Sequence, residues 1–179
     1  MEPDKAKIDK QVLVTYASKH GATAEIAEKI AQVFCQADLQ IDVLPVDQVK
    51  DLTPYQAVVL GSAIYIGQWR KDAARFLQTY ETPLAQRQVW LFSSGPTGKR
   101  EPKKIQKDQR LPESLQPVAD RIQPRDIAVF CGNLDMKKMN FIEKTMIKRV
   151  NAPFGDFRDW EAIAAWAAGI VDVVKEDVK

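Results

Sequence analysis

Short, uninterrupted apolar runs alternate along this chain with stretches of helical periodicity, and this alternation limits the possible folds more than any other feature. The runs typical of buried strands are 11–17, 41–46, 57–61, 88–93 and 126–131. Helical spacing predicts helices over 21–36, 70–80, 113–122, 139–150 and 159–174, with one or two helical turns within 47–55. Such an order indicates an α/β fold, in which helices cover both faces of a five-stranded parallel sheet.

The length of 179 residues, 45% of them hydrophobic, fits a single domain with one core. We expect residues 1–10, which are polar and charged, to form a flexible N-terminal tail rather than a secretory signal, followed by one domain over 11–179. No run approaches the roughly 20 apolar residues that span a bilayer. Cys35 and Cys131 show no metal-ligand spacing, so we predict reduced thiols in or near the core of a cytoplasmic protein, and no metal site.

Three loops follow predicted strands and should meet at the carboxyl edge of the sheet, where ligands bind in such folds. They read SKHGAT (18–23), GSAIYIGQW (61–69) and SSGPTG (93–98). The first combines the hydroxyls of Ser18 and Thr23 with Gly21 just before a helix, which favours an anion site for a terminal phosphate. An ordinary capped turn would have the same residues. The Walker and dinucleotide patterns GxxxxGK[ST] and GxGxxG are both absent.

The second and third loops add features that suit a flat heteroaromatic ring. Tyr65 and Trp69 could stack on such a ring, although Trp69 could instead pack under the neighbouring helix. The backbone amides around Gly95 and Gly98 could bond the polar edge of the ring. His20 is the only histidine, and its place in the first loop favours a phosphate neighbour over a catalytic base. We identify no dedicated acid–base pair and therefore name no catalytic residue.

The first loop and the helix after it resemble the phosphate-binding signature of the flavodoxins, through the pattern Tyr16-x-Ser18-x-x-Gly21-x-Thr23-x-x-x-Ala27-x-x-Ile30. Thr15 departs from that signature, in which an apolar residue is usual. The resemblance implies a flavodoxin-like three-layer sandwich with strand order 2-1-3-4-5 and bound FMN. It places the phosphate against Ser18, Lys19, His20, Gly21, Ala22 and Thr23. It places the ring between Ser62, Ala63, Ile64, Tyr65 and Gly67 on one side and Ser94, Gly95, Pro96, Thr97 and Gly98 on the other.

Other segments resemble one branch of the superfamily, the flavodoxin-type, menaquinone-dependent protoporphyrinogen oxidases. They are GSAIYIGQWRKDAARF (61–76), GDFRDWEAIAAWA (155–167) and, within a predicted helical insertion over about 133–153, NFIEKTMIKRV (140–150). The resemblance implies an FMN-dependent dehydrogenase of heme biosynthesis that acts on a tetrapyrrole and passes electrons to a quinone. The alternative is a flavodoxin-like carrier that shuttles electrons between protein partners. The third loop lacks the usual acidic residues, which removes negative charge near the ring.

Positive charge is concentrated in two segments, although the net charge is only +2. Segments 95–110 and 136–150 each carry a net charge of +4, so the remainder carries −6. Segment 136–150 is also rich in Met and amphipathic, which suits an anionic membrane surface or a substrate with carboxylates. The alternative is a solvated helix whose apolar stripe packs on the core. No motif accompanies the charge that would indicate nucleic-acid binding.

Overall fold

The computed structural model describes residues 11–95 and 110–177. Five parallel strands form the central sheet in the spatial order β2 (Gln40–Pro45), β1 (Gln11–Ala17), β3 (Tyr55–Tyr65), β5 (Gln88–Ser94) and β6 (Asp126–Phe130). Counted along the chain, these five strands have the order 2-1-3-4-5. The predicted α/β fold and its strand order are therefore confirmed. A short sixth strand, β4 (Gln68–Trp69), pairs antiparallel with the end of β3.

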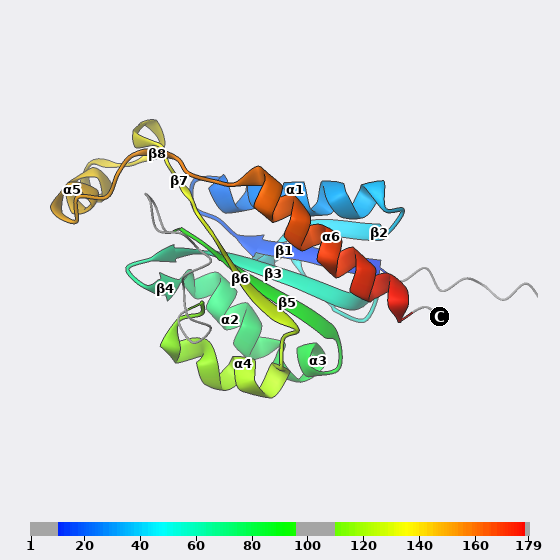
Figure 1. Ribbon diagram of the computed structural model, residues 1–179. Helices are drawn as coiled ribbons and strands as arrows, with labels where there is room; N and C mark the ends of the chain where they lie inside the picture. The colour runs from blue at the N-terminus through cyan, green and yellow to red at the C-terminus, as the bar shows by residue number, and fades with distance from the viewer. Residues whose placement is uncertain (1–10, 96–109, 178–179) are drawn as a thin grey trace, which may run out of the picture.

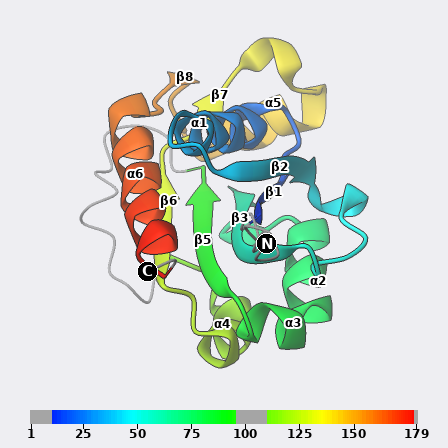
Figure 2. The ribbon, with the colours of Figure 1, turned by 90° about the vertical axis from the view of Figure 1, so that its right-hand side faces the viewer.

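Helices cover both faces of this sheet, as Figures 1 and 2 show. One face carries α1 (Ala22–Gln36) and α6 (Trp160–Glu176). The other carries α2 (Lys71–Thr79), α3 (Glu81–Ala85) and α4 (Gln116–Ile122). Two short 3₁₀ helices, η1 (Val46–Gln48) and η4 (Glu113–Leu115), belong to connections on this second face. The result is a three-layer sandwich.

Alternation along the strands fills a separate core on each face. In β1, Val12 and Val14 pack in the core with α1 and α6, whereas Leu13 packs in the opposite core with α2 and α4. Gly61 allows the close packing between β3 and β5, because a Cβ at this position would lie 2.0 Å from the ring of Phe92. The sheet is thus buried on both sides, and the ends of its strands are left to form a site.

Two connections differ from the sequence-based expectation. The predicted helical turns over 47–55 reduce to η1, and β3 already begins at Tyr55. Asp51 accepts a hydrogen bond from the backbone N–H of Thr53 (2.9 Å), which forms a local turn that competes with a helix. Helix α3 was not predicted, because its five residues are too few to show a periodic pattern.

The two cysteines lie in different environments, so the prediction that both belong in or near the core is wrong for one of them. Cys131, just after β6, is buried, whereas Cys35 lies on the exposed side of α1. Both are free thiols. The remaining side of α1 carries the buried residues at helical spacing, including Ile26 and Ile30.

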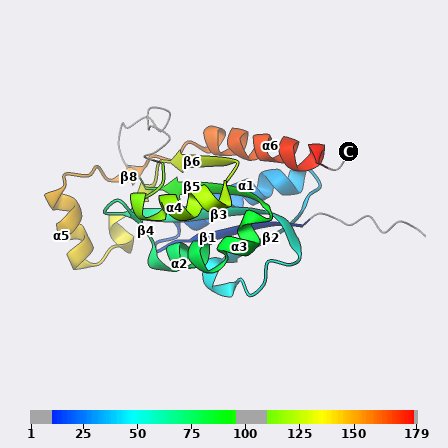
Figure 3. The same cartoon turned by 90° about the horizontal axis from the view of Figure 1, so that it is seen from below.

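The segment between β6 and α6 projects beyond the sheet. A two-stranded antiparallel ribbon of β7 (Asn133–Leu134) and β8 (Gly155–Asp156) brackets it, and it contains η5 (Met136–Lys138) and α5 (Phe141–Arg149). Figures 1 and 3 both show α5 past the end of the sheet where β3 turns into β4. No residue of α5 is buried, so its apolar stripe does not pack on the described core. Met139, which we expected within the helix, precedes it and is buried.

Candidate functional site

The first loop joins β1 to α1 at the carboxyl edge, and its geometry suits an anion. Gly21 adopts a left-handed conformation (φ +93°), and its N–H donates to Ser18 Oγ over 3.0 Å. Gly21 has no side chain to cap α1, and no other side chain in the described part of the protein caps that turn. The first backbone N–H groups of α1 therefore face the loop together with the positive end of the helix dipole. A Cβ on Gly21 would stand 4.0 Å from Lys138 Nζ.

Thr23 and Ser94, both predicted to contact the cofactor, also contact each other. Their hydroxyl oxygens are 2.7 Å apart, and both side chains are buried. This bond fixes the start of α1 against the end of β5, two elements that the chain separates by 71 residues. The first and third loops thus meet at one edge, as predicted. Pro96, Thr97 and Gly98 lie outside the described residues.

The second loop is a β-hairpin rather than an open loop. β3 continues through Ala63 and Ile64 to Tyr65, and β4 returns at Gln68. Ile66 and Gly67 between them have φ of +49° and +69°, as a two-residue type I′ turn requires. The predicted strand end at residue 61 is therefore wrong, because periodicity alone could not distinguish a strand extension from a glycine-flanked loop. The hairpin projects Tyr65 and Ile66 at the edge.

Ser62, another predicted cofactor contact, is fully buried and its hydroxyl is engaged within the protein. Its Oγ donates to the carbonyl of Ala63 (3.0 Å) and accepts from the backbone N–H of Arg70 (3.1 Å). These bonds tie β3 to the start of α2. The side chain of Ser62 therefore holds the base of the hairpin together.

Trp69 belongs to the core and forms no part of an exposed ring site. It is 5% exposed, and its Nε1–H donates to Ser93 Oγ over 2.8 Å. Ser93 in turn donates to the carbonyl of Arg110 (2.9 Å). Of the two aromatic residues expected at the ring, only Tyr65 reaches the edge. Its ring centroid lies 6.0 Å from Lys19 Nζ, and burial of the phenol raises the pKa of Tyr65.

The insertion contacts the first loop through charged groups that sequence reasoning did not single out. Glu143 Oε1 contacts Lys19 Nζ and lies 3.3 Å from His20 Nε2, while Lys138 Nζ donates to the carbonyl of His20 over 3.3 Å. The hydrogen bond from Lys19, followed by one from the backbone N–H of Asn140, lowers the pKa of Glu143 to about 2. The spacing Asn140-x-x-Glu143 marks a capping box and could have located the helix start. Nothing in the sequence indicated that Glu143 would also meet the loop.

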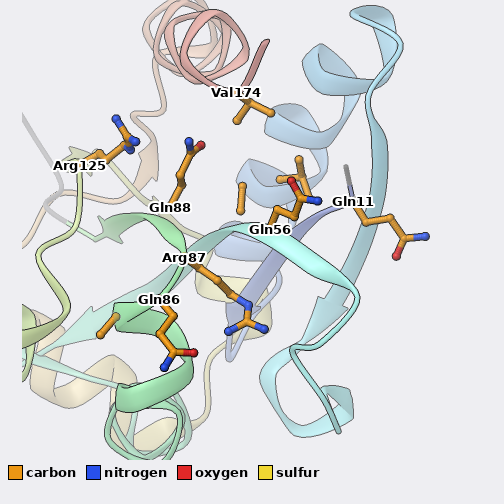
Figure 4. A pocket seen from close by; sticks show the side chains of 10 residues that line it. Gln11, Gln56, Gln86, Arg87, Gln88, Arg125 and Val174 are labelled. Carbon is orange, nitrogen blue, oxygen red and sulfur yellow. The ribbon is translucent and has the colours of Figure 1, made fainter. Parts of the chain in front are cut away.

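Each of the two edges of the sheet has a cavity beside it, and the two cavities differ in size. A small one of about 20 Å³ lies at the carboxyl edge, among residues that include His20, Tyr65 and Lys138. A larger one of about 360 Å³ lies at the amino edge, lined mainly by glutamine and arginine side chains (Figure 4). There the guanidinium of Arg87 donates to the carbonyls of Tyr55 (2.8 Å) and Pro83 (2.6 Å). Ligands of open parallel sheets bind at carboxyl ends, so the smaller cavity marks the candidate site.

At one sheet edge, the chain therefore presents the uncapped start of α1, the left-handed Gly21 and the two lysines Lys19 and Lys138. The hairpin of β3 and β4, with Tyr65 exposed near its tip, lies beside them. Residues 13–160 match the flavodoxin domain family, which shows that the chain belongs to this family. The family implies a flavin cofactor, and the donors at the start of α1 fit the phosphate of such a group.

One relative is the protoporphyrinogen IX dehydrogenase (quinone) of Escherichia coli strain K12. It is 22% identical over 171 residues, which cover 89% of this chain and 94% of the relative. Among solved structures, oxidised flavodoxin 1 from Bacillus cereus has a TM-score of 0.59 at 16% identity, with 91% of this chain and 98% of that chain covered. Rubredoxin oxygen:oxidoreductase from Desulfovibrio gigas has a TM-score of 0.60 at 14% identity. Here 95% of this chain matches only 38% of that longer chain. These likenesses agree with the observed fold.

Proposed function

We propose that this protein binds FMN and acts as an FMN-dependent oxidoreductase. When bound, the flavin supplies the redox chemistry by accepting a hydride or single electrons. The first loop, with the uncapped start of α1, Lys19 and His20, would hold the phosphate. Tyr65 would cover one side of the ring, and Gly95 would lie at the other. The observation that carries this proposal is the meeting of these loops at the carboxyl edge.

The assignment of the cofactor is tested by reconstitution. Purified protein incubated with FMN and then desalted should remain yellow, with the absorption near about 450 nm that oxidised flavins share. Riboflavin, which lacks the phosphate, should bind more weakly than FMN, because it leaves the first loop empty. Protein that takes up neither flavin would refute the proposal. Equal affinity for the two would refute the phosphate site while leaving a ring site in place.

We further propose that the substrate is protoporphyrinogen IX, or a close tetrapyrrole relative in heme biosynthesis, and that a quinone accepts the electrons. The support is the likeness to the Escherichia coli dehydrogenase over nearly its whole length, at 22% identity. The projecting, basic insertion at the same edge as the flavin loops also favours this function. Its cations, including Lys137, Lys138 and Lys144, could attract the carboxylates of such a substrate.

The decisive experiment is turnover by the FMN-loaded protein with protoporphyrinogen and a menaquinone analogue, followed through porphyrin fluorescence. We expect oxidation that depends on both FMN and quinone. Absence of turnover, combined with rapid electron exchange with a redox protein, would instead support the second candidate, an electron carrier. That alternative is favoured by the likeness of the fold to flavodoxins.

We also propose that α5 lies on the cytoplasmic face of an anionic membrane, where the protein could reach a quinone held in that membrane. Its outward side carries Phe141, Ile142, Met146 and Val150, all exposed, with Lys148 and Arg149 among them. Exposed apolar groups of this size favour a lipid interface over bulk water, and the cations match its charge. No helix in the described ranges is both long and apolar enough to cross a bilayer.

Liposome sedimentation tests this contact. Replacing Lys144, Lys148 and Arg149 with Glu should lower binding to anionic liposomes at least about 100-fold, since each cation near the surface contributes about 1 kcal/mol. The matched control replaces Lys50, Lys71 and Arg75, all exposed elsewhere on the protein, with Glu. Binding that falls equally in both variants would show an unspecific charge effect. Binding that changes in neither would refute a role for α5.

A further inference from the structure

Glu143 connects the insertion to the phosphate loop with both of its carboxylate oxygens. Oε2 accepts from the backbone N–H of Asn140 over 3.0 Å and so caps the start of α5. Oε1 faces Lys19 Nζ and His20 Nε2. Lys138, two residues before Asn140, adds a bond to the carbonyl of His20. The start of α5 is therefore fastened to the first loop by polar contacts.

These polar contacts dominate the placement of α5, because the helix contributes little apolar burial. Phe141, Ile142 and Val150 are 83%, 69% and 73% exposed. Met139 is the buried apolar residue nearest to the helix start. A helix with one anchored end and no buried side chain can change position at low cost, since few packed contacts have to break.

We propose that Glu143 is a latch that holds α5 on the first loop until a phosphate binds there, and that phosphate binding releases the helix. This inference rests on the proposed FMN site. A bound phosphate would bring negative charge beside Lys19 and His20, the two side chains that hold Glu143. It would compete with the carboxylate for both and repel it directly. Occupancy of the cofactor site and the position of α5 are thereby coupled.

The coupling must act in both directions, because linkage between two equilibria is reciprocal. If phosphate binding opens the latch, then opening the latch by mutation must strengthen phosphate binding. The variant Glu143→Gln keeps the size of the side chain and loses its charge. We expect it to bind FMN about 5- to 10-fold more tightly than the unmodified protein. Riboflavin affinity should not change, because riboflavin brings no phosphate to the loop.

The first experiment measures FMN and riboflavin affinities by quenching of flavin fluorescence. Glu176→Gln is the matched control, since it removes one exposed carboxylate from the far end of α6. It should leave both affinities unchanged. Weaker FMN binding by Glu143→Gln would overturn the latch and make Glu143 a positioning residue for Lys19 and His20. An unchanged FMN affinity would overturn it as well.

The second experiment follows hydrogen exchange of the α5 amides at neutral pH. In the unmodified protein, FMN and inorganic phosphate should each speed this exchange about tenfold, whereas riboflavin should not. In Glu143→Gln the exchange should be fast from the start and insensitive to all three. Slower exchange on FMN binding would overturn the latch.

The two proposals can fail separately. If inorganic phosphate released α5 in a protein that binds no flavin, the proposal that FMN is the cofactor would be refuted. The proposal that Glu143 couples phosphate binding to α5 would stand. Tight FMN binding with unchanged exchange of α5 would refute the latch and keep the cofactor. The same experiments therefore show which proposal fails, the FMN site itself or its coupling to α5.

Discussion

Helices α5 and α6 have similar apolar patterns in the sequence, yet they lie in opposite environments. Ile163 and Ala167 of α6 are fully buried against the sheet, whereas α5 buries none of its apolar residues. Both helices begin with a side-chain cap at hydrogen-bonding distance, from Asp159 in α6 and Asn140 in α5. The comparison shows that apolar spacing and a cap define a helix, whereas the surface available to it decides what the helix covers.

The largest expected effect is on folding stability. Ile163→Ala in α6 should lower the free energy of unfolding by about 2–5 kcal/mol, because it leaves a cavity in the core under the sheet. Ile142→Ala in α5 is the matched control and should change it by no more than about 0.5 kcal/mol. Urea unfolding followed by tryptophan fluorescence measures both. Similar losses in the two variants would show that α5 belongs to the folded core.

A smaller effect should mark the point where the insertion rejoins the body. Arg158 follows β8, and its side chain is 5% exposed. It pairs with Glu25 of α1 and with Asp156, and its guanidinium lies 4.5 Å from the Trp160 ring centroid. Arg158→Ala should lower stability by about 1–3 kcal/mol, because the charged hydrogen bonds of a buried group are lost.

The control for Arg158 is Arg121→Ala, which removes the more exposed pair with Glu81 and should lower stability less than Arg158→Ala does. Urea unfolding again provides the measurement. If the two variants lost the same stability, the junction at Arg158 would be no firmer than an ordinary surface ion pair. The contacts of Arg158 would then not belong to the stably folded part of the protein.

A third prediction distinguishes the roles of the two aromatic residues of the hairpin, Tyr65 at the sheet edge and Trp69 in the core. Tyr65→Ala should weaken flavin binding about 2- to 10-fold, because stacking on a ring contributes about 0.5–1.5 kcal/mol. Trp69→Phe should leave flavin affinity unchanged and lower stability by about 1 kcal/mol, since Ser93 loses the Nε1–H donor. Flavin titration and urea unfolding distinguish the two. Weaker flavin binding by Trp69→Phe would restore the sequence-based interpretation of Trp69 as a ring contact.

The smallest effect concerns pH and is local to α5. The pKa of Glu143 is about 2 in the folded protein, below its ordinary value of 4.5. A depressed carboxyl pKa stabilises the contact fully above the ordinary value, and this stabilisation is lost as pH falls from about 4.5 to about 2. Lys19, His20, Lys138 and Tyr65 are the titratable groups near this carboxylate.

An NMR titration of the Glu143 side-chain carboxyl tests this prediction directly. Its midpoint should lie near about 2 in the unmodified protein and move toward the ordinary value in Lys19→Gln, which removes the first cause of the shift. Lys29→Gln, in the middle of α1, is the control and should leave the midpoint unchanged. An ordinary midpoint in the unmodified protein would mean that α5 is not held by this ion pair.

Prediction from the sequence succeeded where the signal was local or repeated. The five strands follow from periodicity, and the first loop from one glycine at a helix start. The order of the strands was implied by the resemblance of that loop and helix to the flavodoxins. It failed at the hairpin, because Ala63 and Ile64 extend a strand that a glycine at 61 seemed to end. It also misplaced Cys35 on the basis of residue type alone.

The sequence by itself determined the layers of this protein, because each strand and each helix carries the apolar spacing of the face it buries. Only the tertiary structure decided the content of the site. Thr23 bonds Ser94, Trp69 bonds Ser93, and Glu143 meets Lys19 and His20 across more than 120 positions. Such pairs depend on where the chain returns to the sheet edge. The distance between two side chains there bears no relation to their separation in the sequence.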